Sequence, residues 1–217
     1  MQIDDILAPY GAKMTWEIKA GLMGKGTSSE SAYGPIEDFN SIPVQEESTN
    51  HLFSFFPNIA LTKEEFAVQR DIGQRRLWPT VRPLPGVQKL IAHLSKHKIP
   101  IVVATSSKRS NFLLKSAHLH QEVFGCFGCG VQGSREMVVC ADDVSDKTIG
   151  KPDPYIFLYA AREKLGRGVG HGEENVGSEH ELERGKGLVF EDAILGVEAG
   201  KRAGMSGAFF ERLETRC

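Results

Sequence analysis

Long apolar runs, a leader-like N-terminus and an excess of charge of one sign are all missing from this 217-residue sequence. No run approaches the roughly 18–20 apolar residues that a membrane span requires, and residues 1–11 lack the charged and apolar regions of a signal peptide. The 26 lysines and arginines nearly balance the 28 aspartates and glutamates, and we interpret the basic cluster Arg75-Arg76 as a solvated helix face. These absences predict no membrane association, no nucleic-acid partner and a cytoplasmic location.

Cysteine is scarce too, because four cysteines are too few for a disulfide framework in a chain of this size. We therefore expect reduced thiols. Cys126 and Cys129 have the Cys-x-x-Cys spacing of a redox centre or of half a zinc site, but the sequence offers no second such pair and no His-x-x-His partner. We interpret them as loop residues, and a metal-binding module built on them is the weakest of the functional alternatives.

The first part of the sequence, residues 1–82, has helical and irregular patterns and no convincing strand. Thr15 is a candidate N-cap, and Thr62 with Glu65 forms a capping-box signature at the start of a long helix. Gly34-Pro35 interrupts the weaker segment between them. The chain length suits one domain, or one domain that carries a smaller inserted one.

From residue 83 onward, short apolar runs alternate with helical patterns, which predicts an α/β fold with a doubly wound parallel sheet. The segment 166–187 is rich in glycine, glutamate and histidine and has no periodicity, so we interpret it as a flexible surface insertion with solvated histidines. The apolar runs are 99–107, 137–143, 187–192 and 207–210, and the helical patterns are 87–94, 111–118, 150–166 and the stretch after 192.

Three polar clusters follow strands of this predicted sheet, where the site of an open α/β fold lies. Thr105-Ser106-Ser107 offers hydroxyls and backbone N–H groups that hold a phosphate oxygen, or alternatively cap a helix. Lys151 precedes a proline-initiated helix, where it neutralises a phosphate and a carboxylate together or is simply a surface lysine. Glu191-Asp192 supplies hard oxygen ligands for Mg²⁺, or an acidic helix N-terminus favoured by the helix dipole.

In this order, the stretches VVATSS (102–107), GKPDPYIF (150–157) and LVFEDAILGVEAGKRAGM (188–205) resemble the second, third and fourth motifs of the haloacid dehalogenase-like hydrolase superfamily. The resemblance is closest to the phosphatase branch with a small helical cap, and TWEIKAGLMGK (15–25) resembles the first segment of such a cap. It implies a helical cap domain over 1–82 and an α/β core domain with a Rossmann-like sheet over 83–217.

The resemblance also implies roles for the residues of the three motifs. Thr105, with Ser106 beside it, would bind the transferring phosphoryl group, and Lys151 would orient that group against the nucleophile. Asp192 would be a Mg²⁺ ligand supported by Glu191. The implied cofactor is therefore Mg²⁺, and the implied partner is a small phosphorylated metabolite.

Two further positions, Gly24 and Lys25, would lie on the cap loop that faces this substrate. The implied activity is Mg²⁺-dependent hydrolysis of small phosphate monoesters such as sugar or nucleoside phosphates. A phosphosugar mutase remains an alternative on the same motifs, since only the cap and the acceptor differ. A catalytically dead binding or regulatory protein derived from this superfamily is the alternative from another class.

One part of the family's pattern is missing from the sequence. The family transfers the phosphoryl group to an aspartate, while a second acid two residues later protonates the leaving oxygen, and both belong to an Asp-x-Asp-x-Thr-like motif on the first core strand. The pairs Asp4-Asp5 and Asp142-Asp143 have the wrong spacing. We therefore expect the first core strand, which the resemblance places between the strands ending at Thr105 and Glu191, to be missing, and the chain as written to be catalytically inert and marginally folded.

Overall fold

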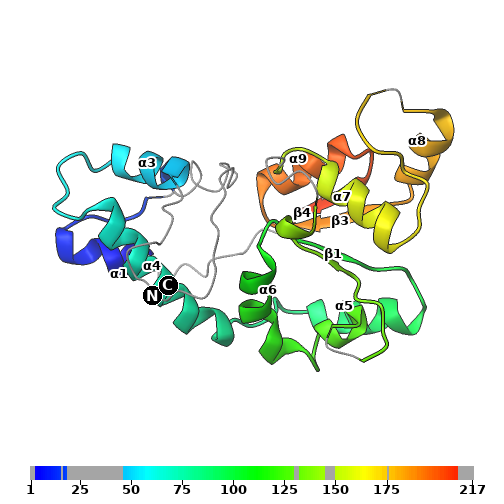
Figure 1. The fold of residues 1–217 in the computed structure, drawn as a ribbon, viewed down its shortest axis with the longest axis horizontal. Helices are drawn as coiled ribbons and strands as arrows, with labels where there is room; N and C mark the ends of the chain where they lie inside the picture. The colour runs from blue at the N-terminus through cyan, green and yellow to red at the C-terminus, as the bar shows by residue number, and fades with distance from the viewer. Residues whose placement is uncertain are drawn as a thin grey trace. The chain divides into compact units, whose positions relative to one another are not determined.

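A computed structural model of the chain describes residues 3–15, 17–18, 46–129, 132–144, 150–174 and 176–209. The chain divides into two compact units, Met1–Val81 and Arg82–Cys217, each with its own elements (Figure 1). The boundary predicted from the sequence lies one residue later. Gly24 and Lys25 lie outside the described residues, as does the Gly34-Pro35 interruption.

The described part of the first unit is helical and contains no strand. The capping box predicted for α4 is confirmed, because Thr62 Oγ1 accepts a hydrogen bond from the N–H of Glu65 at 3.1 Å and the N–H of Thr62 donates to Glu65 Oε2 at 2.9 Å. Thr15 Oγ1 accepts from the N–H of Ile18 at 3.4 Å, the contact expected of an N-cap. The elements are α1 (Ile3–Leu7), η1 (Ala8–Tyr10), α3 (Glu46–Ser54), α4 (Lys63–Leu77) and η3 (Trp78–Thr80).

Apolar side chains from three helices of this unit form one core. Ile6 and Leu7 of α1, Leu52 of α3 and Phe66 of α4 are all buried in it. Phe53 packs edge to face against Phe66, with ring centroids 5.7 Å apart. The first unit is therefore a small helical body with its own hydrophobic core.

The second unit alternates strands and helices as the sequence predicts, but its strands are shorter. Its helical elements are α5 (Val87–Lys96), α6 (Arg109–Ser116), η4 (Ala117–Leu119), η5 (Phe124–Phe127), η6 (Ala141–Asp143), α7 (Tyr155–Tyr159), η7 (Ala160–Lys164, a π-helix that continues α7), α8 (Ser178–Arg184) and α9 (Ile194–Arg202). Its strands are β1 (Val103–Ala104), β2 (Val138–Val139), β3 (Leu188–Glu191) and β4 (Ser206–Phe209).

All four described strands form parallel pairs, which confirms the α/β class. β1 pairs with β2, with Val103 opposite Val138, and β3 pairs with β4, with Leu188 opposite Ser206. Among the described residues, β1 and β3 are not paired with each other, so these strands form two two-stranded sheets rather than one continuous sheet. The single doubly wound sheet and the extra strand between β1 and β3 stay predictions.

Strand β2 is buried on both faces, whereas β1, for which the apolar run predicts the same burial, is only half-buried. Val138 belongs to a core cluster with Phe112 and Phe127, whereas its neighbour Val139 belongs to a second cluster on the other face. This second cluster also contains Val189 of β3, so both strand pairs share one hydrophobic core. The ends of β1 and β3, which carry the candidate site residues, are thereby held by common packing.

The segment 166–187 differs from its prediction as an aperiodic insertion, because α8 occupies 178–184. The sequence pattern did not predict α8, because its sequence, SEHELER, has no apolar stripe. Its one large apolar residue, Leu182, is 72% exposed. Arg184 at its end is buried, with 4% exposure, and donates through Nε to the carbonyl of Val169 at 2.6 Å and through Nη2 to that of Gly172 at 2.7 Å. Arg162 donates to the carbonyl of Gly170 at 3.1 Å. Two guanidinium groups therefore fix the path of this loop.

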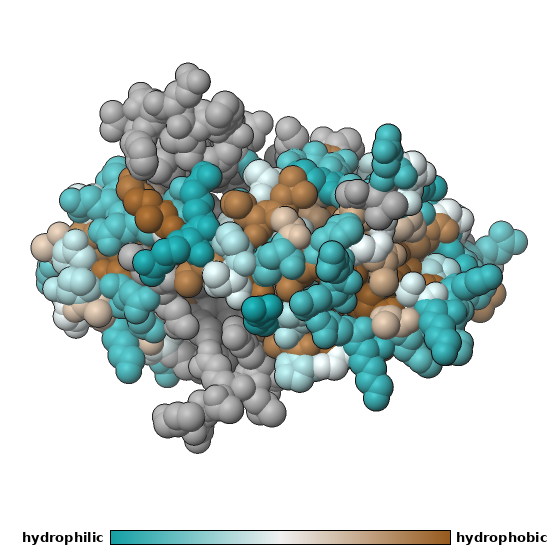
Figure 2. Space-filling model, turned by 90° about the horizontal axis from the view of Figure 1, so that it is seen from below, coloured by the Kyte–Doolittle hydropathy of each residue, from teal (hydrophilic) through white to brown (hydrophobic). Residues whose placement is uncertain are grey.

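The surface of the described chain offers no membrane-spanning element: in these ranges every helix is too short or too polar to cross a bilayer. On the face shown in Figure 2, hydrophilic side chains lie among scattered apolar ones.

Candidate functional site

Lys151 and Glu191, two of the predicted site residues, are in direct contact. Lys151 lies just before α7 and Glu191 is the last residue of β3, and the Lys151 ammonium forms an ion pair and hydrogen bond with the Glu191 carboxylate. The two side chains are only 14% and 11% exposed. Lys151 Nζ also lies 4.8 Å from the ring centroid of Phe157, within the range of a cation–π contact. The lysine is therefore a held, largely buried cation, and its interpretation as a surface lysine is wrong.

Gly196, in the first turn of α9, makes room for the Glu191 carboxylate. A Cβ atom at this position would come closer than 3.0 Å to the carboxyl carbon and both oxygens of Glu191. Gly200, one turn later, lets the helix approach β3, because a Cβ there would lie 3.2 Å from Val189 Cβ. Gly196 thus leaves the space for the carboxylate that holds Lys151, and Gly200 lets α9 lie close to β3.

Asp192 follows Glu191 and is exposed, in the turn between β3 and α9. Its carboxylate is a hard oxygen ligand of the kind that Mg²⁺ prefers, and Mg²⁺ usually takes one or two protein carboxylates and completes its shell with waters and substrate phosphate. Among the residues that the structure describes, no group of three or more His, Cys, Asp or Glu side chains gathers as a metal cage. The donor set at this turn therefore fits a Mg²⁺ ion held by Asp192, with Glu191 engaged by Lys151.

The turn after β1 carries the other predicted residues, Thr105 and Ser106. The N–H of Thr105 donates to the carbonyl of Val139 at 2.9 Å, and Thr105 Oγ1 accepts from the N–H of Ser107 at 3.1 Å. The N-cap of the following helix α6 is Lys108, so the alternative that Thr105 caps this helix is wrong. Thr105 is half-buried and Ser106 is exposed, which leaves the turn open to a ligand on one side.

These residues come from two strand ends that share one core but do not all touch. Ala104, the last residue of β1, packs against the cluster that contains Val189 of β3. In the described ranges, Thr105 makes no direct hydrogen bond to Lys151 or Asp192. The structure thus brings Lys151 and Glu191 into contact. Thr105 follows β1 and Asp192 follows β3, and the two strands pack against the same hydrophobic core.

Cys126 and Cys129 do not converge on a ligand. Cys126 is exposed whereas Cys129 is buried, and its backbone carbonyl is hydrogen bonded to the His120 ring. Burial, with a smaller contribution from Glu136, raises the pKa of the Cys129 thiol to about 11. Because the thiolate is the metal ligand and the nucleophile, a thiol that stays protonated at neutral pH disfavours the metal-binding alternative.

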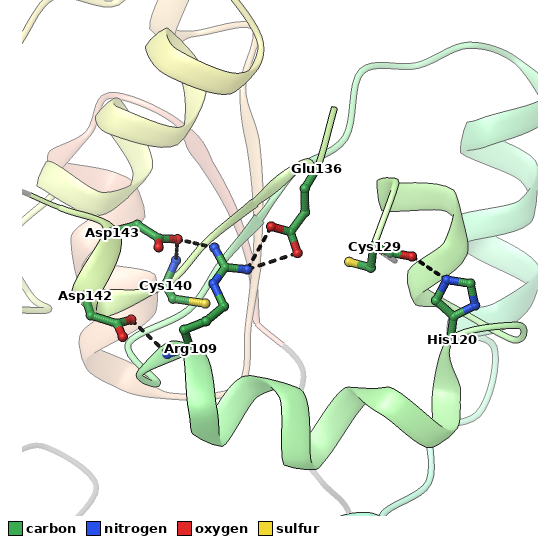
Figure 3. A network of polar contacts seen from close by, with 7 residues as sticks. All are labelled: Arg109, His120, Cys129, Glu136, Cys140, Asp142 and Asp143. Carbon is green, nitrogen blue, oxygen red and sulfur yellow. Dashed lines mark hydrogen bonds and ion pairs between the residues drawn. The ribbon is translucent and has the colours of Figure 1, made fainter. Parts of the chain in front are cut away.

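A network around Arg109 that the sequence pattern did not predict joins the start of α6 to residues on either side of β2 (Figure 3). The guanidinium lies between Glu136, whose two oxygens accept from Nη1 at 3.0 Å each, and Asp143, whose carboxylate accepts from Nη2. The N–H of Arg109 donates to Asp142 Oδ1 at 2.8 Å, and the N–H of Cys140 donates to Asp143 Oδ2 at 2.7 Å. Burial acts to lower the pKa of Arg109, but the neighbouring acidic groups outweigh it and raise it. The network ties the start of α6 to the loop after β2.

The signal for this network is present in the sequence, since an acid pair directly after one apolar run and an arginine at the start of the preceding helix favour such an ion pair. From the sequence, Asp142-Asp143 was interpreted only as a poor match to a nucleophile motif. The structure gives this pair a different role, as the acceptor of the Arg109 backbone and side chain.

Comparison with known proteins agrees with this geometry. The haloacid dehalogenase-like hydrolase family matches residues 34–204, and the chain belongs to that family. The resemblance inferred from the three motifs is therefore confirmed.

Individual relatives place the chain among phosphatases. It is 33% identical over 201 residues to (DL)-glycerol-3-phosphatase 2 of Arabidopsis thaliana, covering 93% of this chain and 67% of the relative. It is 32% identical over 203 residues to a probable pseudouridine-5'-phosphatase of Drosophila melanogaster, covering 92% and 68%. The chain thus spans about two thirds of the length of these relatives.

A solved structure shares the fold. The crystal structure of a putative phosphoglycolate phosphatase from Lactobacillus plantarum superposes with a TM-score of 0.51, covering 94% of this chain and 74% of that chain, at 14% sequence identity. At this identity the likeness concerns the fold alone. It supports a mixed α/β fold with parallel strands.

Proposed function

We propose that this chain carries the phosphate-binding and Mg²⁺-binding part of a phosphatase site for small phosphate monoesters. The observation that carries the proposal is the buried Lys151–Glu191 pair at the end of β3, next to the exposed carboxylate of Asp192. An ammonium held by one carboxylate keeps its orientation, which favours the binding of a phosphate dianion. The family membership of the chain gives this chemistry its context.

Each residue then has a defined task. The hydroxyls of Thr105 and Ser106 bind phosphate oxygens, since the N–H groups of Thr105 and Ser107 already donate to Val139 and to Thr105 Oγ1. Lys151 neutralises a further oxygen, and Glu191 keeps the lysine aimed. Asp192 holds Mg²⁺, which when bound offsets the repulsion between a carboxylate nucleophile and the phosphate.

The substrate class follows from the relatives as part of the proposal. The names of the two curated relatives refer to glycerol-3-phosphate and to pseudouridine-5'-phosphate, and both compounds are small monoesters of a hydroxyl-rich group. We infer that this chain binds a monophosphate of that size. Gly24 and Lys25 stay predicted contacts of the substrate.

A second candidate, binding without hydrolysis, is favoured by one specific observation. The 217 residues contain no Asp-x-Asp-x-Thr-like motif. Thr105, Lys151 and Asp192 position a phosphate, but none of them is a carboxylate nucleophile paired with an acid two residues later. On this candidate the chain is a phosphate-binding protein that retains the family's motifs.

The experiment that separates these functions combines turnover with binding. The purified chain is assayed for phosphate release from glycerol-3-phosphate and from nucleoside monophosphates, with Mg²⁺ or with EDTA, and its affinity for inorganic phosphate is measured by calorimetry. Asp192→Asn should weaken phosphate binding in the presence of Mg²⁺ about tenfold or more, whereas the exposed α9 control Glu198→Gln should not. Turnover that depends on Mg²⁺ supports the phosphatase, and Mg²⁺-dependent binding without turnover supports the second candidate. Equal affinity of both variants would refute the metal assignment.

A further inference from the structure

Lys115 on α6 points back toward the turn at the end of β1. Its Nζ donates a hydrogen bond to Ser107 Oγ at 3.0 Å, across eight residues of sequence. The side chain is only partly exposed, and burial lowers the pKa of Lys115. A lysine gives up part of its hydration only where partners replace it, so its place beside this turn is informative.

Ser107 is the junction of the turn. Its N–H donates to Thr105 Oγ1 at 3.1 Å, its hydroxyl accepts from Lys115, and its carbonyl accepts from the N–H of Ala141 at 3.1 Å. One residue thereby joins the predicted phosphate-binding hydroxyl, helix α6 and the loop after β2. Displacement of Ser107 would move the Thr105 hydroxyl and the N–H groups of the turn together.

The opposite side of the turn is already fixed. Arg109, at the start of α6, is held by Glu136 and Asp143, so the first turn of the helix does not slide relative to β2 (Figure 3). Lys115, six residues after the first residue of α6, adds a side-chain hydrogen bond from this helix to the turn. The Arg109 network and the Lys115 hydrogen bond therefore both restrain the residues of the turn and the start of α6.

We propose that Lys115 is a positioning residue that acts through Ser107 to hold the Thr105–Ser107 turn in the shape that binds a phosphate. The inference deepens the proposed function and rests on it. Lys115 itself does not contact the phosphate. Its effect on binding is passed on by the Ser107 hydroxyl.

A double-mutant cycle with inorganic phosphate and Mg²⁺ as the probe tests this path. Lys115→Met and Ser107→Ala should each weaken phosphate binding about tenfold, and the double variant should be no weaker than either single one, because both remove the same contact. Lys115→Arg, which restores a donor, should recover part of the affinity. Lys96→Met on the exposed end of α5 is the matched control and should leave the affinity unchanged. Additive losses, or an unchanged affinity of Lys115→Met, would overturn the inference.

A second measurement does not depend on phosphate. Amide hydrogen exchange of Ser107 and Ala141 in the free chain should become several-fold faster in Lys115→Met and stay the same in Lys96→Met. Unchanged exchange overturns the positioning role whether or not phosphate binds. If exchange responds but the wild-type chain binds no phosphate, the proposed function fails while the hold of Lys115 on the turn stands.

Discussion

Replacing Gly196 by alanine is expected to destabilise the second unit by displacing a carboxylate. The new Cβ would occupy the space of the Glu191 carboxyl group, closer than 3.0 Å to its carbon and both oxygens. An exposed glutamate carboxylate can rotate away from such a clash at a small cost in free energy. The Glu191 side chain is only 11% exposed and is ion-paired with Lys151. Moving it breaks the ion pair and leaves a largely buried ammonium without its carboxylate.

The magnitude is a balance of two effects. Breaking a buried ion pair by removal of one partner costs about 3–5 kcal/mol, and the residual exposure of this pair argues for the lower end. Alanine in a helix is more favourable than glycine by about 0.5–1 kcal/mol. The net expectation for Gly196→Ala is a loss of about 2 kcal/mol in the free energy of unfolding, or roughly 6 °C in Tm for a unit of this size.

The assay is urea and thermal unfolding of four variants that form a cycle. In the Glu191→Ala background the obstructing carboxylate is gone, so Gly196→Ala should there be neutral or stabilising by about 0.5–1 kcal/mol. Gly168→Ala is the matched control, because a Cβ at Gly168 meets nothing within 4 Å. The reasoning is refuted if Gly196→Ala destabilises both backgrounds equally, or if it does not destabilise the wild-type chain.

Two other predictions concern the buried cation and the buried thiols. Lys151→Met should weaken the binding of inorganic phosphate, measured by calorimetry, about tenfold or more. The control Lys201→Met, on the exposed side of α9, should leave this affinity unchanged. Equal small effects of the two substitutions would argue that Lys151 has no role in binding. Burial raises the pKa of Cys129 to about 11 and of Cys140 to about 12, above the unfolded value of 9.0, so the stability that these thiols contribute is complete below pH 9 and is lost as the pH rises through 11–12. Between pH 8 and pH 10, denaturant titrations should show that the free energy of unfolding falls by about 1.4 kcal/mol for each thiol. Cys140→Ala should remove about half of this fall. A fall of the same size in that variant would contradict the assignment.

Local signals in the sequence predicted most of the elements but not their extents. The capping box at Thr62 depends on neighbouring residues only, so α4 begins where the pattern indicates. Helix α7 begins at Tyr155, later than the proline directly after Lys151 predicts. The strands depend on long-range pairing, and the apolar run 99–107 yields only the two residues Val103–Ala104 as a strand. Apolar runs therefore locate strands in the chain without fixing their length or their partners.

Sequence motifs pointed to single residues of the candidate site but not to the contacts between them. Lys151 and Glu191 were identified from their places at strand ends, yet their direct contact spans 40 residues and follows only from the packing of α7 and α9. Lys115 carries no motif, and its bond to Ser107 depends on the direction of α6 relative to β1. Contacts that arise from how elements cross are the part that the sequence pattern does not contain.

Backbone carbonyls, and not side chains, receive the guanidinium bonds that hold the glycine-rich loop before α8. A carbonyl is present whatever the residue, so new side chains at most positions of 166–172 leave the bonds of Arg162 and Arg184 intact. Gly166 and Gly170 are exceptions, because their φ values of +66° and +71° favour glycine, and Val169 is another, because its side chain is buried in the core. This loop can therefore change its sequence while it keeps its path, which makes it the part of the unit where a new surface can evolve with the smallest loss of stability.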